Sequence, residues 1–473
     1  MKDLRFVPAT ELASMISRRD VSPVEVIDAF LAAIEQYNPA LNLFCFVYPH
    51  EARAAARRAE TAVLKGDPLG PLHGVPFAIK DFTPTRGKRT TLGSYAFEHW
   101  VPDDDPPILD RLYGAGGILI GKTTTPEFAH SGFTYSPLWG VSRNPWDPTR
   151  TPGGSSGGSA GAVAASIVPI AEGSDAGGSI RIPAAFCGVV GFKPSHGRIP
   201  MHITPNDFES IFHLGPIART VTDAALMFSV MQGPDERDPT SLVPSLDVSL
   251  RPDTDLTGVR LALSLDLGYY AIDPEVASAV TTAAGVFRSR GAIVEAVDLG
   301  WSREINDAWF AYWGVVMAAS YGDMVAEHGH HMDPGVRALI ESGSLMSAVD
   351  LKRIELLRSR QWQAIRPILE QYDALLCPTT ALTAPPAEAN DRDFEGTTPD
   401  GRYAGLDLTS PFNFIGQCPV VSVPCGFSRD AMPIGMQIVG RRFDDASVLR
   451  LAAAFEEAAP WKQRRPPLKA GAP

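Results

Sequence analysis

The sequence lacks the features that mark membrane proteins and secreted proteins. Its 473 residues contain no uncharged stretch long enough to cross a bilayer. The N-terminus has no charged segment followed by an apolar one, so no secretory signal peptide is expected. Cysteine is scarce, odd in number and never arranged as C-x-x-C, which indicates free buried thiols and predicts a reducing, cytoplasmic location. The five cysteines are Cys45, Cys187, Cys377, Cys418 and Cys425.

Positively charged residues are fewer than negatively charged ones. Lysine and arginine number 42 against 54 aspartates and glutamates, which gives a formal net charge of −12. This balance argues against nucleic acid or an anionic membrane as a main partner. We therefore expect no nucleic acid and no membrane partner, and the oligomeric state is left open between a monomer and a homodimer.

The chain shows no internal repeat, no low-complexity linker and no shift of composition that would divide it. Hydrophobic residues make up 45% of the sequence, enough for a sizeable core. The length would allow about three domains or one large α/β domain. Short apolar strands alternate with helices and glycine turns, which favours a sheet covered by helices.

Two glycine-serine clusters are the most informative feature that is present. They occupy residues 153–158 and 177–179, and they start 24 residues apart. Lys80 precedes them at the end of the apolar run 75–79, which is typical of a buried strand. A serine–serine–lysine set can transfer an acyl group without histidine, metal or cofactor. Lysine acts as a base only when neutral, so its pKa must fall from about 10.4, and burial achieves that. The neighbouring Asp81 would oppose this shift, so we expect its carboxylate to point elsewhere.

Residues 153–167, followed by residues 173–181, resemble the amidase signature family of hydrolases. Further blocks that are similar to the family occur in the same order along nearly the whole chain, and the stretch from about 240 to about 370 is the weakest match. These blocks are residues 71–81, 188–195, 215–221, 376–380 and 433–440.

The resemblance implies a fold and an activity. It implies one large α/β domain over residues 1–473, with a mixed central β-sheet covered by helices. Within it we expect an N-terminal helical segment (1–70), a signature core (71–200) and the remainder of the domain (200–473). The implied activity is hydrolysis of the C–N bond of small-molecule carboxylic amides through an acyl-enzyme on Ser179. Aryl amides or carbamates (urethanes) are the favoured substrates, with ester hydrolysis as a side activity.

The resemblance also implies a role for each site residue. Ser179 would be the nucleophile, Ser155 the bridging serine, which in the family follows a cis peptide bond, and Lys80 the base. Backbone N–H groups of Ala176, Gly177, Gly178 and Ser179 would stabilise the oxyanion. No cofactor and no metal is implied. Supporting roles around these groups fall to Ser156, Asp175 and Arg181, although Arg181 could equally bind local carbonyl groups.

The serine cluster at 153–158 admits two other interpretations. A flexible linker at 153–158 is disfavoured because residues 159–167 are typical of a buried, small-residue helix. The same cluster matches G-x-S-x-G, the nucleophile elbow of α/β-hydrolases, but that motif follows a strand directly. Residues 144–152 contain three prolines and no strand pattern.

Three rival functions stay open at this stage. The family includes the amidase subunit of glutamyl-tRNA amidotransferase, which supplies ammonia to a partner. A non-catalytic binding protein on the same scaffold is the second. A Ser-His-Asp esterase is the third, and its candidate bases have no distinctive context: His73, His130, His196, His202 and His213.

A histidine-rich segment also invites a metal interpretation. His328, His330 and His331 follow Asp323 and Glu327. A solvated helix end and turn is favoured, because a proline and a glycine follow at once, at positions 334 and 335.

The pattern predicts several local elements. Ser22 and Glu25 form a capping box for a helix that should end near residues 38–39. Helices are expected at 51–65 and 274–290, and strands at 117–121, 166–171 and 259–263. Residues 387–403 are polar and should form a mobile surface loop.

Aromatic residues gather in segments 128–139 and 309–313, both candidates for the rim of a substrate pocket. Core packing is favoured for the second, whereas a pocket lined by either would suit a hydrophobic or aryl substrate.

Overall fold

The computed structural model describes residues 3–248, 250 and 255–468. Eleven strands form one sheet in the order β1-β3-β2-β6-β8-β7-β12-β13-β11-β9-β10. Its strands are β1 (Phe44–Val47), β2 (Pro76–Lys80), β3 (Ile118–Thr123), β6 (Ile170–Asp175), β7 (Val190–Lys193), β8 (His213–Ala218), β9 (Arg260–Leu263), β10 (Ile293–Ala296), β11 (Ala374–Pro378), β12 (Val420–Phe427) and β13 (Pro433–Gly440). A separate two-stranded ribbon consists of β4 (Tyr135–Ser136) and β5 (Gly140–Val141).

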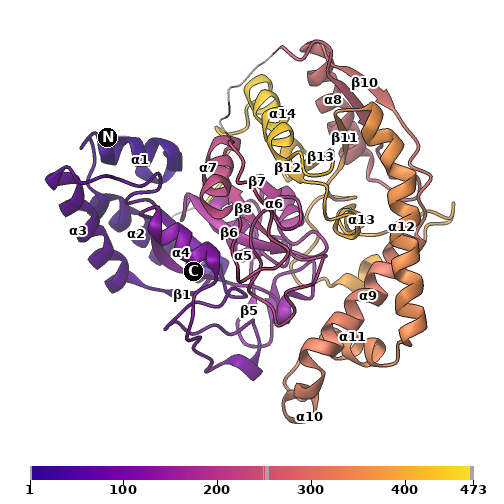
Figure 1. The fold of residues 1–473 in the computed structure, drawn as a ribbon, viewed down its shortest axis with the longest axis horizontal. Coiled ribbons are helices and arrows are strands. Elements are labelled where there is room, and N and C mark those ends of the chain that lie inside the picture. Colours follow the sequence, from indigo (N-terminus) through magenta and orange to yellow (C-terminus); the bar gives the residue numbers. More distant parts are fainter. Residues whose placement is uncertain (1–2, 249, 251–254, 469–473) are drawn as a thin grey trace.

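Helices surround this sheet (Figure 1). The N-terminal helices α1 to α3 lie at one end of the molecule and the orange helices α9 to α12 at the other. The α-helices are α1 (Ala9–Ser17), α2 (Pro23–Leu41), α3 (Pro49–Lys65), α4 (Pro107–Gly114), α5 (Gly157–Ala164), α6 (Arg181–Cys187), α7 (Val221–Met231), α8 (Pro274–Ser289), α9 (Glu304–Tyr321), α10 (Val325–His328), α11 (Pro334–Ser344), α12 (Ala348–Gln371), α13 (Pro411–Phe414) and α14 (Asp445–Ala458). Short 3-10 helices are η1 (Leu4–Phe6), η2 (Tyr95–Phe97), η3 (Glu127–Ala129), η4 (Gly322–Met324) and η5 (Asp391–Phe394).

The sheet is mixed, and its parallel part positions the site. β2 runs parallel to β3 and β6, whereas β6 pairs with β8 in the antiparallel sense. Because β2 and β6 are parallel neighbours, their carboxyl ends meet at the same edge of the sheet. Lys80 ends one strand and Asp175 the other. The prediction of one α/β domain with a mixed sheet covered by helices is confirmed, and its finer division at residues 70 and 200 stays a prediction.

The capping box at Ser22 is confirmed, and its helix extends two residues beyond the end expected near residues 38–39. Ser22 accepts from Val24 N, Glu25 accepts from Ser22 N, and α2 then continues through Pro39 to Leu41. A proline in a helix interior removes one N–H donor and kinks or breaks the helix, but Pro39 lies in the last turn of α2. The helix ends instead where Asn42 adopts the left-handed conformation, with φ of 51°.

The strand expected at 166–171 lies further along the chain. Ser166 has φ of 56° and turns the chain after α5, so β6 begins only at Ile170 and runs to Asp175. Hydrophobicity misplaced this strand because its second half carries buried polar side chains, Glu172, Ser174 and Asp175. Those polar side chains belong to the site described below. The helices expected at 51–65 and 274–290 and the strands at 117–121 and 259–263 are confirmed within two residues.

The structure also describes the helices and the cysteines that bear on membrane insertion and disulfide formation. Within residues 3–248, 250 and 255–468, no helix is both long enough and apolar enough to cross a bilayer. All five cysteines carry free thiols.

Candidate active site

Lys80 is completely buried at the end of β2, with its ammonium nitrogen turned toward two serines. Nζ donates to Ser155 Oγ at 2.6 Å and to Ser174 Oγ at 2.9 Å. Burial lowers the pKa of Lys80 to about 7, although the charges of Glu172 and Asp175 work in the opposite direction. The uncharged amine, which can accept a proton, is therefore accessible near neutral pH.

The carboxylates around Lys80 are held by other groups. Asp81 accepts from Thr91 N at 3.2 Å and lies 3.6 Å from Lys122 Nζ. The expectation that Asp81 points away from Lys80 is thus confirmed. Glu172 accepts from Lys80 N and from Thr83 Oγ1, both at 3.0 Å, and burial raises the pKa of its carboxyl. Among the described residues, the hydrogen-bond partners of Lys80 Nζ are therefore hydroxyl groups, with no carboxylate.

Ser155 follows a cis peptide bond after Gly154, as the resemblance implied. Both Ser155 and Ser156 are fully buried just before α5. Ser156 N donates to Ser179 O at 3.1 Å, and Ser156 Oγ donates to Ser174 O at 3.2 Å. These two bonds fix the start of α5 against β6 and the turn that carries Ser179, which explains the supporting position predicted for Ser156.

Ser179 stands apart from the buried pair. It is partly exposed and lines a cavity, and within the described residues its hydroxyl group has no hydrogen-bond partner. Lys80 and Ser155 are thus in contact, whereas no hydrogen bond links Ser155 Oγ to Ser179 Oγ within the part of the chain described. The arrangement leaves the Ser179 hydroxyl group open to a substrate.

The turn 176–179 is fixed by its carbonyl groups. Ala176 O accepts from Trp309 Nε1 at 3.1 Å, and Gly177 O accepts from Thr409 Oγ1 at 2.6 Å. Gly178 O accepts from Ile182 N at 2.7 Å, and Ser179 O accepts from Ser156 N. Because four successive carbonyls are bound by the protein, the turn holds one orientation.

The N–H groups of this turn divide into two kinds. Gly178 N donates to Asp175 Oδ1 at 2.8 Å, so this predicted oxyanion donor is engaged within the protein. Within the described residues, the N–H groups of Gly177 and Ser179 have no acceptor. Gly178 also has φ of 135°, a conformation for which glycine is suited. The free donors therefore lie on either side of the residue that shapes the turn.

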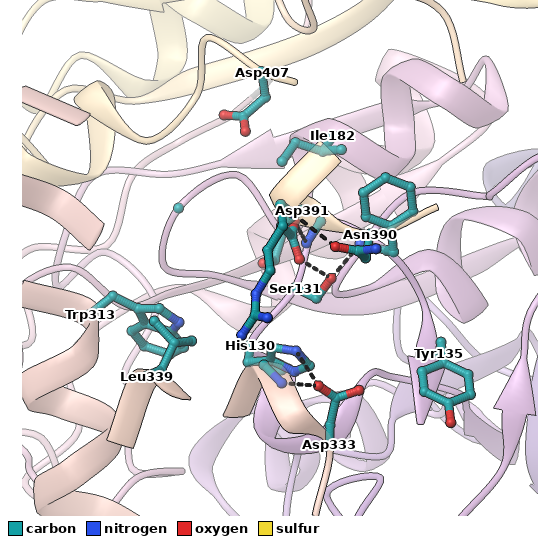
Figure 2. A pocket seen from close by; sticks show the side chains of 18 of the residues that line it. His130, Ser131, Tyr135, Ile182, Trp313, Asp333, Leu339, Asn390, Asp391 and Asp407 are labelled. Carbon is teal, nitrogen blue, oxygen red and sulfur yellow. Dashed lines mark hydrogen bonds and ion pairs between the residues drawn. The ribbon is translucent and has the colours of Figure 1, made fainter. Parts of the chain in front are cut away.

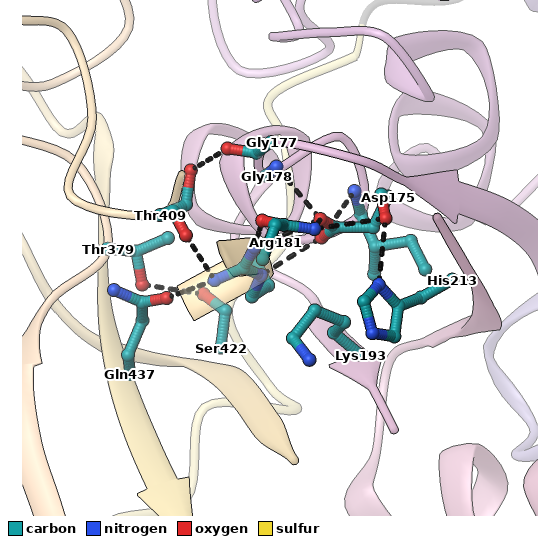
Figure 3. Close-up of polar contacts among 12 residues, drawn as sticks. Asp175, Gly177, Gly178, Arg181, Lys193, His213, Thr379, Thr409, Ser422 and Gln437 are labelled. Atoms are coloured by element: carbon teal, nitrogen blue, oxygen red, sulfur yellow. Dashed lines mark hydrogen bonds and ion pairs between the residues drawn. The ribbon is translucent and has the colours of Figure 1, made fainter. Parts of the chain in front are cut away.

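A buried ion pair between Asp175 and Arg181 supports the turn 176–179 (Figure 3). Arg181 Nε and Nη2 each donate to one Asp175 oxygen at 2.9 Å, and neither side chain is exposed. Burial acts to raise the pKa of Asp175, but the charge and hydrogen bonds of Arg181 outweigh it and hold that pKa well below its usual range. Arg181 also donates to Asn413 Oδ1 at 2.6 Å and to Gln437 Oε1 at 2.8 Å. Arg181 therefore supports the turn and is too deeply buried to meet a substrate.

A cavity of about 680 Å³ opens beside Ser179 (Figure 2). One wall comes from α9, through Trp309, Phe310 and Trp313. Both aromatic segments singled out in the sequence line it, because Phe133 and Tyr135 face the same space. The expectation that 309–313 belongs chiefly to the core was incomplete: Trp309 and Trp313 are buried and line the cavity together.

Two aspartates that line the cavity interact with neighbouring residues of its lining. Asp333, which caps α11, lies 3.6 Å from His130 Nε2, and Asp391 accepts from Ser131 Oγ at 2.5 Å. The segment 387–403 contributes Asn390, Asp391 and their neighbours to the lining instead of standing clear of the fold. The segment therefore forms part of the cavity wall.

Several site residues were missed by sequence reasoning. Ser174 lies in the family block 173–181 but has no hallmark of a lysine partner. Thr409 and Asn413 lie in segments that carried no signal. Asp391 lies in the polar segment 387–403, which was expected only as a surface loop, and Gln437 lies in the block 433–440 without an assigned role. Only long-range contacts identify them.

One histidine, His130, lines the same cavity as Ser179. Among the described residues, no histidine hydrogen-bonds to Ser155 or Ser179. His73 Nε2 contacts Ala59 O at 3.0 Å, and His213 contacts backbone carbonyls from a buried position. Burial lowers the pKa of both His196 and His213. The described parts of the chain contain no group of three or more histidine, cysteine, aspartate or glutamate side chains that could hold a metal ion.

Comparison with known proteins gives one consistent family. The sequence model of the family described as Amidase matches residues 25–449. An acylamidase of Rhodococcus erythropolis is 35% identical over 469 residues, covering 98% of each chain. A glutamyl-tRNA(Gln) amidotransferase subunit from a strain of Chloroflexus aurantiacus is 34% identical, covering 99% of this chain and 100% of the relative.

Solved structures agree. A bacterial aryl acylamidase of the amidase signature enzymes superposes with a TM-score of 0.91 at 33% identity, covering 97% of each chain. The chain belongs to the amidase signature family and is an amidase that hydrolyses amide C–N bonds.

Proposed function

We propose that Ser179, Ser155 and Lys80 form the catalytic set of this amidase. Neutral Lys80 accepts the proton of Ser155, which in turn takes the proton of Ser179 as its oxygen attacks the amide carbonyl carbon. The tetrahedral intermediate collapses by breaking the C–N bond, and the proton returns through Ser155 to the leaving amine. Water then hydrolyses the acyl-enzyme by the same route. The observation that carries this proposal is the 2.6 Å bond between buried Lys80 and Ser155.

We assign the oxyanion to the turn that bears Ser179. The N–H groups of Gly177 and Ser179 lie free beside the nucleophile, and they become the donors to the developing negative charge. Ala176 stays a predicted contributor. Gly178 holds the turn through Asp175 and contributes to the oxyanion only if that bond lengthens as substrate binds.

The substrate proposed is a small acyl amide with an aryl leaving group. The cavity walls next to Ser179 are apolar and aromatic, with Trp309, Phe310 and Ile182 among them. Such a surface gains more from an aryl ring than from a small polar amide. The similarity to an acylamidase and to a bacterial aryl acylamidase supports the same class. Carbamates, and esters as a side activity, present the same carbonyl chemistry and stay within the proposal.

A matched nitrophenyl series tests both parts. Acetanilide, carbamate and ester analogues are compared on the wild type and on Ser179→Ala, Ser155→Ala and Lys80→Ala. We expect each substitution to lower kcat/KM by at least about a thousandfold, as removal of a catalytic group does. Turnover of the anilide or carbamate supports the aryl class. Near-wild-type activity in Lys80→Ala would refute the catalytic set, and alanine at His73 or His202, neither of which lines the cavity, serves as the control.

A second candidate is the ammonia-supplying subunit of a glutamyl-tRNA amidotransferase. The observation in its favour is the 34% identity to a subunit of such an enzyme over almost the whole chain. Glutaminase activity, alone or with co-purified partners, would support it. Failure to hydrolyse any nitrophenyl substrate, together with release of ammonia from glutamine, would decide for this alternative. The cytoplasmic location and the choice between a monomer and a homodimer stay predictions.

A further inference from the structure

Asp391 links two segments that line the cavity, 387–403 and 131–134 (Figure 2). It is the first residue of η5, within the polar segment 387–403. Its two carboxylate oxygens accept from Ser131 Oγ at 2.5 Å and from Gly132 N at 2.9 Å. Within the described residues, Asp391 forms no ion pair. Its negative charge is therefore stabilised by hydrogen bonds from these two neutral donors. The contact joins segments 260 positions apart in the chain.

The geometry of both partners favours this contact. Asn390 caps η5 by accepting from Arg392 N at 3.1 Å, which fixes the start of the helix and the direction of Asp391. On the other side, Ser131 Oγ also accepts from Phe133 N at 3.0 Å. A Cβ at Gly132 would lie 3.1 Å from Asp391 Oδ1, so the backbone approaches the carboxylate closely. The carboxylate thereby orders the turn 131–133.

That turn rests directly on the peptide that carries Ser155. A Cβ placed on Gly154 would lie 2.5 Å from Ser131 O and 2.6 Å from Phe133 N. One residue further on, Thr134 Oγ1 donates to Gly153 O at 2.7 Å and accepts from Gly157 N at 3.2 Å. Residues 131–134 therefore cradle 153–157 from the cavity side. A displacement of this cradle would move Ser155 relative to Lys80.

We propose that Asp391 is a positioning residue that couples the segment 387–403 to the placement of Ser155. Its carboxylate holds the turn 131–133 against Gly154, and this contact keeps Ser155 at hydrogen-bond distance from Lys80. Without this carboxylate the segment and the proton relay are uncoupled. This inference rests on the proposed catalytic roles of Ser155, Ser179 and Lys80.

Asp391→Ala tests the coupling with kcat and KM measured separately on the anilide substrate. We expect kcat to fall by at least about tenfold, because small displacements of catalytic groups are costly. We expect KM to change by less than about threefold, because Asp391 acts through Ser155 more than through substrate contact. Asp391→Asn keeps an acceptor for Gly132 N and gains an amide that can donate to Ser131 Oγ. It should recover most of the lost kcat.

Asp400→Ala is the matched control. Asp400 lies in the same segment and accepts from Thr398 Oγ1 at 2.5 Å, but it does not line the cavity. Its removal deletes the same charge and should leave kcat unchanged. Ser131→Ala removes one of the two bonds to Asp391 and should give an intermediate kcat, which keeps the test available if Asp391→Ala does not fold.

The rate of labelling by phenylmethanesulfonyl fluoride separates positioning from wall contact. This small reagent reports on activation of the nucleophile, and the labelled residue is mapped by mass spectrometry. Slower labelling of Ser179 in Asp391→Ala than in the wild type supports the coupling. Equal labelling at Ser179, or a rise in KM alone, would overturn this inference and leave the catalytic set standing. Labelling of the wild type at another residue would overturn the proposed function and this inference with it.

Discussion

Arg181 donates two hydrogen bonds of 2.9 Å to the carboxylate of Asp175, and both side chains are fully buried. The same carboxylate accepts from Gly178 N at 2.8 Å and from Ile180 N at 3.2 Å, on either side of Ser179. One buried ion pair therefore determines the conformation of the turn that presents the proposed nucleophile.

Asp175→Asn should be strongly destabilising. It leaves the Arg181 guanidinium buried without its counter-charge, and breaking such a pair typically costs about 3–5 kcal/mol. Urea unfolding followed by tryptophan fluorescence measures the loss. Lys352→Ala, which breaks the exposed pair with Glu355, should leave the unfolding midpoint unchanged. A native-like midpoint for Asp175→Asn would show that the pair does not hold the turn.

Activity should rise with pH through about 7. Burial places the pKa of Lys80 at about 7, and only the neutral amine accepts a proton, so activity is lost as pH falls through that value. The profile of kcat/KM against pH, measured with a substrate that does not titrate, should be half-maximal near that pH. A rate that is constant between about pH 6 and about pH 9 would argue that Lys80 is not the base.

Trp309 and Trp313 should respond differently to the same substitution. Trp309 Nε1 donates to Ala176 O, whereas the buried Trp313 Nε1 has no partner within the described residues. Trp309→Phe should lower kcat about two- to tenfold, the effect of one hydrogen bond of about 0.5–1.5 kcal/mol. Trp313→Phe removes no hydrogen bond to the turn, so it should lower kcat less than Trp309→Phe does. Equal effects of the two substitutions would mean that the bond to Ala176 O does not shape the turn.

Gly178→Ala should damage both folding and catalysis. A Cβ there would lie 1.8 Å from Thr409 Oγ1, and φ of 135° is unfavourable for any other residue. Overpacking of this kind costs about 1–3 kcal/mol or more. Gly285→Ala, within α8 and with nothing within 4 Å of the new Cβ, should instead add about 0.5–1 kcal/mol. Thermal denaturation and kcat of both variants provide the check.

Local sequence was sufficient for the elements whose causes are local. The capping box at Ser22 and the apolar run before Lys80 specify a helix start and a buried strand, because both depend on neighbouring residues. The order of the family blocks indicated the α/β fold, the family and the placement of Lys80, Ser155 and Ser179. Hydrophobicity failed at β6, where Glu172, Ser174 and Asp175 are buried because the site needs them.

The sequence alone therefore determined which chemical groups are present and which family the chain resembles. These groups are two serine-bearing turns and one lysine at the end of a buried strand. Only the tertiary structure decided how these groups are held. Arg181 meets Asn413 and Gln437 across 232 and 256 positions, and Asp391 meets Ser131 across 260. The lowered pKa of Lys80 belongs with them, because desolvation comes from every element packed around the side chain. Such contacts are invisible to local patterns, since distance along the chain carries no information about distance in the folded molecule.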